Sequence, residues 1–225
     1  SDVYKRQAKK VFYHALAVLW SPAYRTENES ALQQDWPRIP IPADPAVLEA
    51  SAQLGRTVAD LLLPDKPVPG VTTGKLRPEL RDLGVPTKAA GPIDPATDLD
   101  VKAGWGFRGQ KNAVMCGKGK VVPSKANPSG AVDVYINEHV CWANVPADVW
   151  TMTIGGYPVI KKWLSYRESK ILRRPLHLEE MTYITEVIRR LKALLLLGEK
   201  LDANYRDASL NTLTLSTTSG SIGIR

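Results

Sequence analysis

The spacing of hydrophobic residues changes twice along this chain. Segments toward both ends repeat apolar residues at helical spacing, whereas residues 99–154 contain short runs of β-forming residues separated by glycine, proline and asparagine. Strands joined by such short connections pair antiparallel, and helices outside them cannot serve as crossovers of a parallel sheet. The sequence therefore predicts an α+β fold in which helices flank an irregular, mostly antiparallel central β module.

The first helical part is predicted over residues 8–63. Helical spacing extends to Trp20 and stops before Pro22, because the residue that precedes a proline disfavours the helical conformation. A proline-rich extended stretch follows, and Asp44 and Pro45 then supply an N-cap and a first-turn proline for a second helix.

The second helical part is predicted over residues 158–198. A short apolar stripe precedes a longer one, which Gly198 is expected to close as the glycine just beyond a helix end. Prolines and glycines recur through residues 64–95, which indicates a long connection with little regular structure.

We expect one domain over residues 8–206. It consists of a helical part, a β-rich module and a second helical part: 8–63, 99–154 and 158–198. Residues 1–7 and 207–225 are expected to be disordered or non-native ends.

The composition favours a cytoplasmic protein. No apolar run approaches the roughly 18 residues of a membrane span, and the first residues contain no apolar signal segment. The two cysteines, Cys116 and Cys141, suggest no disulfide framework, which fits a reducing compartment. No membrane partner is expected.

Positive charge is concentrated in one segment. The formal net charge is +7, and the segment from Val101 to Gly130 accounts for +6 of it, because it has six cations and no acidic residue. These cations are Lys102, Arg108, Lys111, Lys118, Lys120 and Lys125. Phosphate backbones bind to positive charges that are free of neighbouring carboxylates, so the segment favours a nucleic-acid partner over merely solvated turns.

Polar and aromatic residues in the same segment are candidates for base contacts. The amides of Gln110, Asn112 and Asn127 could read base edges. Trp105 and Phe107 could stack on or wedge between bases, or they could belong to the core.

A second basic segment reads "VIKKWLSYRE" over 159–168. The helical stripe places Trp163 on the packed side, which leaves the segment's cations available for phosphate contacts. The candidates here and in the following turn are Lys161, Lys162, Arg167, Arg173 and Arg174. The alternative is an ordinary amphipathic helix with solvated charges.

The chain contains partial matches to nucleotide-binding and metal-binding motifs, but the residues around them do not fit such sites. "GWGFRG" (104–109) has the glycine spacing of a dinucleotide site, but no helical pattern follows it. "CGKGK" (116–120) lacks the Ser/Thr of a phosphate loop. The histidines and cysteines do not converge in the sequence as zinc ligands would, so no metal or catalytic site is predicted.

One nuclease-like spacing exists. Asp148 lies twenty residues before Glu168, and Lys170 completes an Asp…Glu-x-Lys pattern that could hold Mg²⁺. In such nucleases the Glu-x-Lys lies on a strand, whereas here the sequence indicates a helix. A Mg²⁺-dependent nuclease is therefore only a remote alternative.

Several segments together resemble one protein family. They are, in order, "VFYHALAVLWSPAYRTEN", "DWPRIPIP", "LGRTVADLL", "AGWG", "VDVYINEHVCWANVP", "IGGYPVIKKWLSYRE", "RRPLHLEE" and "LDANY". From Val11 to Tyr205 the chain resembles the C-terminal specificity domain of Type ISP restriction-modification enzymes. The second and sixth segments are the most specific.

The resemblance implies sequence-specific recognition of double-stranded DNA by this chain, with no catalysis of its own. Adenine-N6 methylation and ATP-dependent cleavage would belong to methyltransferase and helicase/nuclease domains upstream in the same polypeptide. S-adenosylmethionine, ATP and Mg²⁺ are expected only for those domains, and no cofactor is expected here. The alternative is a non-catalytic module that docks onto the methyltransferase or helicase domains.

The chain departs from the family pattern at three positions. Histidine is common where Trp20 stands, an aromatic residue where Cys141 stands, and glycine where Arg173 stands. The first two concern packing, and the third concerns a turn.

Overall fold

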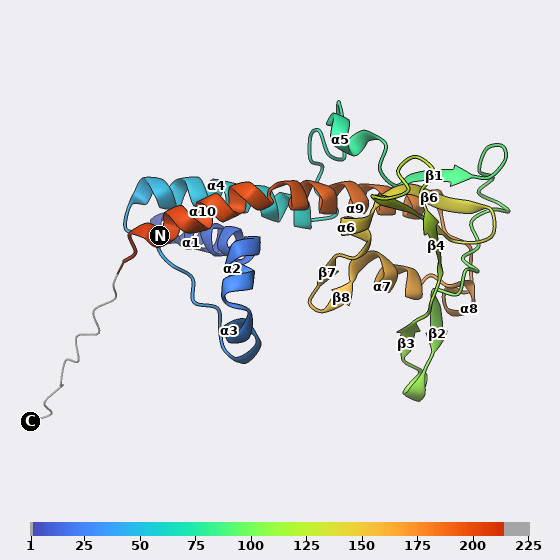
Figure 1. The fold of residues 1–225 in the computed structure, drawn as a ribbon, viewed down its shortest axis with the longest axis horizontal. Coiled ribbons are helices and arrows are strands. Elements are labelled where there is room, and N and C mark those ends of the chain that lie inside the picture. Colours follow the sequence, from blue (N-terminus) through green and yellow to red (C-terminus); the bar gives the residue numbers. More distant parts are fainter. Residues whose placement is uncertain (1, 214–225) are drawn as a thin grey trace, which may run out of the picture. The chain divides into compact units, whose positions relative to one another are not determined.

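The computed structural model describes residues 2–213, and the predicted α+β class is confirmed. The chain forms two compact units (Figure 1). Unit 1 comprises Ser1–Leu63 and Leu197–Arg225, and unit 2 comprises Pro64–Leu196. Residues 207–225 are predicted to be disordered or non-native, and of these 214–225 lie outside the described part of the chain.

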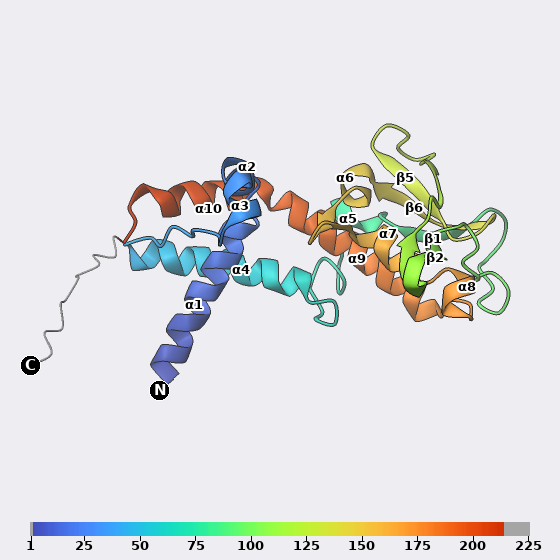
Figure 2. The same cartoon turned by 90° about the horizontal axis from the view of Figure 1, so that it is seen from below.

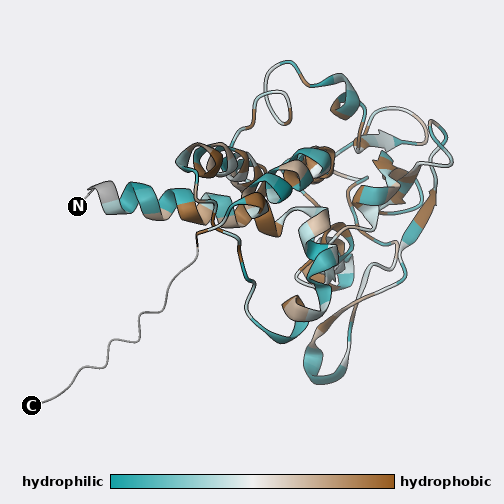
Figure 3. Ribbon diagram, turned by 60° about the vertical axis from the view of Figure 1, so that its left-hand side comes forward, coloured by the Kyte–Doolittle hydropathy of each residue, from teal (hydrophilic) through white to brown (hydrophobic). Residues whose placement is uncertain are grey.

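Unit 1 is helical throughout its described elements. These are α1 (Asp2–Leu19), α2 (Pro22–Glu27), α3 (Glu29–Gln34), α4 (Pro45–Leu62) and α10 (Gly198–Leu210). Helix α1 packs along α4, and at their closest approach a Cβ added to Gly55 would lie 1.7 Å from the carbonyl oxygen of Tyr13. Figure 3 shows the helix at the N-terminus hydrophilic over its first turns and more hydrophobic further along.

The predicted cap of α4 is confirmed, and α2 also has an N-cap. Ser21 follows α1 and caps α2, and its hydroxyl accepts the N–H of Tyr24. The Asp44 side chain accepts the N–H of Ala46, and Pro45 occupies the first turn of α4. In each case the N-cap side chain satisfies one of the free N–H groups at the helix start.

The proline-rich stretch between α3 and α4 is extended, as predicted, and helix α1 holds it from one side. Buried His14 contacts the carbonyl oxygen of Pro40 through Nε2 (2.8 Å) and the Ser51 hydroxyl through Nδ1 (2.7 Å). Because a carbonyl can only accept, Nε2 carries the proton and the hydroxyl donates to Nδ1 in the neutral ring. The Tyr24 hydroxyl donates to the carbonyl of Arg38.

Unit 2 is built on a four-stranded antiparallel sheet in the order β1-β6-β5-β4. The strands are β1 (Val85–Lys88), β4 (Lys120–Pro123), β5 (Ala131–Tyr135) and β6 (Val140–Pro146). Helix α9 (Leu178–Leu196) packs against β1 and β6, and the Trp142 indole N–H donates to the carbonyl oxygen of Met181 (3.0 Å). This sheet and helix enclose the core of the unit.

Shorter elements complete unit 2. Two hairpins are formed by β2 (Gly106–Arg108) with β3 (Val114–Cys116) and by β7 (Thr153–Ile154) with β8 (Tyr157–Pro158). The helices are α5 (Pro78–Arg81), α6 (Ala147–Trp150), α7 (Val159–Ser165) and α8 (Ser169–Leu172), with a 3-10 turn over Gln110–Asn112.

Four local expectations are wrong. Residues 64–95 contain the edge strand β1, which pairs with β6, so that connection is part of the sheet. Gly198 begins α10 instead of ending a helix, because Leu197 before it stays in the right-handed helical region. Helix α1 already covers residues 2–7, and α10 reaches Leu210, although both ends were expected to be disordered or non-native.

The three departures from the family pattern have local explanations. Trp20 is half-buried with Arg25 over its ring, and Cys141 is buried in β6. Arg173 follows α8 with φ 62° and ψ 24°, in the left-handed region that favours glycine. Within residues 2–213, no helix is both long and apolar enough to cross a membrane.

The first prediction concerns pH. Burial lowers the pKa of His14, although the bond to the Pro40 carbonyl opposes the shift. Below pH about 6.5 the unfolded chain then binds a proton that the folded chain does not, so stability is full above that pH and falls as the pH drops. Denaturant unfolding should show a loss of up to about 1.4 kcal/mol per pH unit in this range. His14→Gln should flatten this dependence, whereas the same change at exposed His177 should not.

The second prediction concerns Arg173. Arg173→Gly should stabilise the chain by about 0.5–1 kcal/mol, because the gain from removing left-handed strain exceeds the added chain entropy of glycine. Lys170→Gly, inside α8, should instead destabilise the chain by about 0.5–1 kcal/mol. Urea unfolding measures both, and equal effects of the two variants would contradict the account.

Candidate nucleic-acid interface

The β2–β3 hairpin extends away from the four-stranded sheet (Figure 1). Its strands pair Gly106 with Cys116, Phe107 with Met115 and Arg108 with Val114. Seen from below, β2 and α7 lie next to each other (Figure 2), and both strands of the hairpin contact α7. The hairpin thus carries the middle of the basic segment 101–130 on a two-stranded ribbon.

The tip of this hairpin exposes four of the predicted DNA-binding residues. Gln110, Lys111 and Asn112 form the turn, and all three are exposed. Lys111 (φ 53°) and Asn112 (φ 63°) are left-handed, a conformation that asparagine tolerates and lysine rarely adopts. The Arg108 guanidinium donates to the carbonyl oxygen of Asn112 (3.0 Å), which braces the turn.

Glycines of "GWGFRG" and the nearby Gly117 allow the hairpin to pack closely against neighbouring backbone. A Cβ added to Gly106 would lie 2.0 Å from the carbonyl oxygen of Ser165 at the end of α7. A Cβ added to Gly117 would lie 2.1 Å from the carbonyl oxygen of Gly104. These glycines therefore allow close backbone packing, and a 3-10 turn and a strand follow them in place of the helix that a dinucleotide site needs.

Trp105 anchors the base of the hairpin. Its ring is fully buried, it packs edge-on against Trp150, and its indole N–H donates to the carbonyl oxygen of Tyr135 (2.7 Å). Its backbone N–H donates to the carboxylate of Glu168 (2.7 Å), which is only 6% exposed. Of the two interpretations of Trp105, the structure supports the core residue.

A second basic surface lies on α7 and the β7–β8 hairpin. The Lys162 ammonium lies over two tyrosine rings, 5.2 Å from the centroid of Tyr157 and 5.0 Å from that of Tyr166. Lys161 is half-buried beside it in sequence. As predicted, Trp163 faces inward and packs edge-on against Trp142. The two tyrosines hold Lys162 in place without neutralising it.

The turn of this second hairpin is Gly155-Gly156. Both glycines have positive φ, 58° and 80°, and a Cβ added to either would meet nothing within 4 Å. Glycine is required here by the backbone of a two-residue hairpin turn, which places Tyr157 beside Lys162.

The remaining lysines of segment 101–130 lie elsewhere. Lys102 forms an ion pair with Asp100 (2.6 Å), and the Lys120 ammonium lies 4.4 Å from the centroid of the Tyr135 ring. Lys125 is exposed in the connection between β4 and β5. The segment that has no acidic residue in sequence therefore does not form one acid-free surface.

Lys102 and Lys120 line a pocket of about 400 Å³ that also contains acidic side chains. It is lined by Thr97, Asp98, Asp100, Lys102, Ala103, Lys120, Asn137, Glu138 and His139. Three carboxylates thus face the two lysines, which weakens their attraction for phosphate relative to the hairpin.

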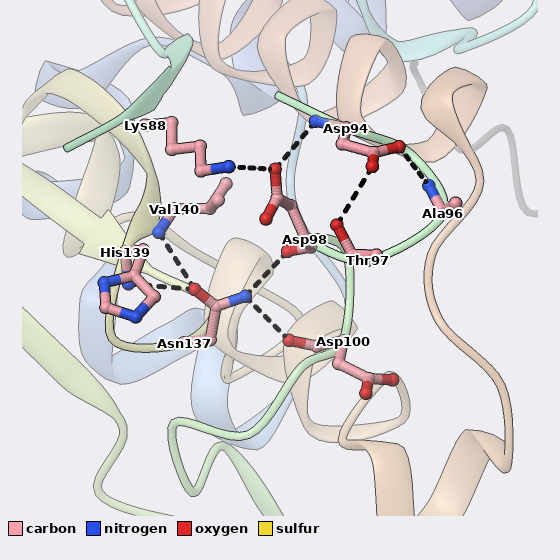
Figure 4. Close-up of polar contacts among 9 residues, drawn as sticks. All are labelled: Lys88, Asp94, Ala96, Thr97, Asp98, Asp100, Asn137, His139 and Val140. Atoms are coloured by element: carbon pink, nitrogen blue, oxygen red, sulfur yellow. Dashed lines mark hydrogen bonds and ion pairs between the residues drawn. The ribbon is translucent and has the colours of Figure 1, made fainter. Parts of the chain in front are cut away.

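The polar groups of this pocket are engaged with one another (Figure 4). The Asn137 amide donates to the carbonyl oxygens of Asp98 and Asp100, and its oxygen accepts the N–H groups of His139 and Val140. The hydrogen bond from Lys88 Nζ (2.6 Å), together with the N–H of Asp94, lowers the pKa of the Asp98 carboxyl. These bonds join the loop before β2 to the β5–β6 turn.

Two of the predicted arginines, Arg167 and Arg174, lie against one carboxylate. Arg174 donates twice to Glu180 (2.6 and 3.2 Å), and Arg167 Nε lies 3.5 Å from the same group. Burial raises the pKa of Glu180, but hydrogen bonds from Arg174 and from the N–H of His177 outweigh it, so the pKa is lowered. Arg173 is exposed and is the one arginine of this group that makes no ion pair among residues 2–213.

The nuclease-like residues do not form a metal site. The Asp148 carboxylate pairs with Lys192 (2.6 Å), whereas Glu168 accepts the N–H of Trp105, and Lys170 is exposed in α8. Among the described residues, no group of three or more His, Cys, Asp or Glu side chains could hold a metal ion.

Two features of this surface were missed at the sequence level. Met115 stands opposite Phe107 on the hairpin, and Tyr157 and Tyr166 flank Lys162. The alternation of β3 was too short to assign a face to Met115. The spacing of Tyr166 four residues after Lys162 on a helix was an available signal.

Comparison with known proteins gives one family and one solved structure. The sequence model of the Type ISP C-terminal specificity domain matches residues 2–185. A nuclease-deletion mutant of the Type ISP restriction-modification enzyme LlaGI, solved in complex with a DNA substrate mimic, is similar with a TM-score of 0.48 and 16% identity. That match covers 88% of this chain but 16% of the LlaGI chain. No curated protein matches.

The third prediction tests the seat of the hairpin. Glu168→Ala leaves the buried N–H of Trp105 without an acceptor and should destabilise the chain by about 2–3 kcal/mol in urea unfolding. Glu168→Gln should cost less, because the amide oxygen can accept the same N–H. The control is exposed Glu138→Ala, which should change stability by less than about 0.5 kcal/mol. Equal stability of Glu168→Ala and the unaltered chain would contradict this assignment.

Proposed function

The chain belongs to the Type ISP C-terminal specificity domain family, and from that premise we propose that it binds double-stranded DNA in a sequence-dependent way. The binding surface is formed by the β2–β3 hairpin, α7 and the β7–β8 hairpin of unit 2. This chain contributes recognition, and it has no catalytic step of its own.

The observation that carries this proposal is the β2–β3 hairpin. The major groove of DNA admits a two-stranded β-ribbon, and Gln110 and Asn112 at the tip offer amide groups that match adenine edges. In the described part of the chain, no carboxylate forms an ion pair with Arg108, Lys111 or Lys118. Their charges are therefore available for phosphates.

The second surface supports the same partner. Lys161 and Lys162 on α7 make no ion pair within residues 2–213, and Tyr157 and Tyr166 limit the motion of Lys162. Because α7 contacts both hairpins, phosphate contacts on α7 would fix the orientation of the ribbon relative to the duplex. Lys102, Lys120, Lys125, Arg167, Arg173 and Arg174 remain weaker candidates.

Recognition by this chain would direct chemistry carried out elsewhere. We propose that adenine-N6 methylation and ATP-dependent cleavage belong to upstream methyltransferase and helicase/nuclease domains of a longer polypeptide. S-adenosylmethionine, ATP and Mg²⁺ would bind to those domains. The chain spans 16% of the LlaGI chain.

Docking onto such domains is the second candidate function, and unit 1 carries the observation that favours it. Trp36 is 87% exposed, and Phe12 on α1 is exposed as well. Large exposed aromatic side chains are typical anchors of protein interfaces. Docking by unit 1 and reading by unit 2 are compatible, because a specificity domain must do both.

The direct experiment is selection of bound duplexes from a random pool with the 225-residue chain, followed by titration of a selected duplex against a scrambled one. About six neutralised phosphates predict a slope of log K against log salt near −5. Recovery of no preferred sequence, or binding without salt dependence, would contradict the proposal. The docking function would then remain, and Trp36→Ala would test it against the purified methyltransferase domain.

The fourth prediction separates phosphate contacts from base contacts. Lys111→Gly removes a charge and also relieves the left-handed strain at that position, so weaker binding cannot reflect unfolding. It should weaken the selected and scrambled duplexes alike and reduce the salt slope by about one, as should Lys118→Ala. Gln110→Ala and Asn112→Gly should instead relax the preference at particular bases.

The matched control is Lys75→Ala. Lys75 is an exposed lysine in the segment before α5, and in Figure 1 α5 lies on the side of the sheet opposite the β2–β3 hairpin. Lys75→Ala should leave the affinity and the salt slope unchanged. If Lys75→Ala and Lys111→Gly reduce the salt slope equally, the attraction for DNA comes from the net charge of the chain and not from the hairpin.

A further inference from the structure

An apolar pair stands on the outer face of the basic hairpin. Phe107 is 53% exposed and Met115 is 47% exposed, and the two residues face each other across β2 and β3. The chain has only two phenylalanines, and both are exposed, although phenylalanine is among the residues most often buried. Single exposed apolar side chains are ordinary, but an adjacent pair on a projecting ribbon indicates a binding contact.

The geometry of the ribbon explains why this pair faces outward. Side chains alternate between the two faces of a strand, and the position of Gly106 faces the end of α7. Phe107 and Met115 therefore lie on the opposite face. A Cβ added to Gly109 would lie 2.7 Å from Cγ of Met115, so the missing side chain at Gly109 leaves room for Met115.

The charge around the pair identifies its partner. The charged residues nearest to the pair in sequence are Arg108, Lys111 and Lys118, and none of them makes an ion pair within residues 2–213. An apolar protein partner would have to desolvate these cations, whereas DNA presents phosphates to them and apolar base faces to the rings. A duplex satisfies both parts of the surface at once.

Resting on the proposed function, we propose that Phe107 and Met115 form an apolar wedge that enters a base step of the bound duplex, next to the bases that the hairpin tip contacts. Phenylalanine and methionine are side chains that partly unstack base steps in this way. Pyrimidine–purine steps unstack most easily, so the wedge would add specificity at a step that no hydrogen bond reads.

The base of the hairpin is built to support such a contact. The N–H groups of Gly117 and Gly119 donate to the carbonyl oxygens of Trp105 (2.6 Å) and Gly104 (3.1 Å). Trp105 is fully buried, and Glu168 accepts its N–H. The ribbon therefore starts from a base that is fixed to the core of unit 2, which positions Phe107 and Met115 for such a contact.

The test uses a selected duplex in which 2-aminopurine replaces adenine at successive positions. This base fluoresces more strongly when it is unstacked, so binding of the unaltered chain should raise the signal at one step and leave the others unchanged. Phe107→Ala should abolish that rise and weaken binding about tenfold, the typical effect of losing a ring–base contact. Met115→Ala should give a smaller effect of the same kind.

Two controls keep the outcomes distinct. Phe107→Leu retains an apolar wedge and should retain most of the fluorescence rise. Exposed Lys75 lies outside the proposed surface, and Lys75→Ala should leave the rise intact. Both alanine positions of the wedge are about half exposed, so circular dichroism should report an unchanged fold.

Salt-dependent binding of the selected duplex with no rise at any position would overturn the wedge while leaving the proposed function standing. Absence of duplex binding would overturn both. If replacing thymine by uracil in the duplex reproduces the loss seen with Phe107→Ala, the pair contacts a thymine methyl group in the groove and the wedge is wrong.

Discussion

The hydrogen bond from the Trp105 backbone to Glu168 is the interaction on which the rest of unit 2 depends. It joins the start of the β2–β3 hairpin to the junction between α7 and α8, two segments 63 residues apart in sequence. A carboxylate that is 6% exposed is costly to bury unless it is hydrogen-bonded, and the N–H of Trp105 is a backbone donor that must itself be satisfied. The N–H group and the carboxylate satisfy each other, so neither the hairpin nor the α7–α8 junction can shift without breaking the bond.

This bond also changes the interpretation of two motifs. "GWGFRG" has the spacing of a nucleotide-binding loop, and Glu168 has the spacing of a nuclease carboxylate. In the structure both belong to one packing arrangement, in which Gly106 lies against α7 and Glu168 holds Trp105. Glycines and a buried carboxylate can serve a nucleotide-binding or catalytic site, and they can equally serve close packing. Only the neighbouring elements distinguish these two uses.

Sequence reasoning identified the parts of the fold that depend on local signals. Apolar spacing and caps located α1, α4 and α9, and the family resemblance is confirmed over residues 2–185. It missed β1, because an edge strand of sequence Val-Pro-Thr-Lys is defined by pairing with β6 and not by its own pattern. It also misjudged Gly198, since two helices joined by one residue leave no turn for a glycine to form.

The candidate site shows a similar limit, because a run of charge in sequence is not a surface of charge in space. Lys102 pairs with Asp100, which stands just outside the acid-free segment, and Arg167 and Arg174 surround Glu180. The hairpin escapes this neutralisation because it extends away from the sheet, where the described carboxylates do not reach its cations within an ion-pair distance. Projection from the fold, more than the number of lysines, makes the β2–β3 hairpin the surface best suited to a polyanion. The same projection leaves Phe107 and Met115 about half exposed in the described part of the chain.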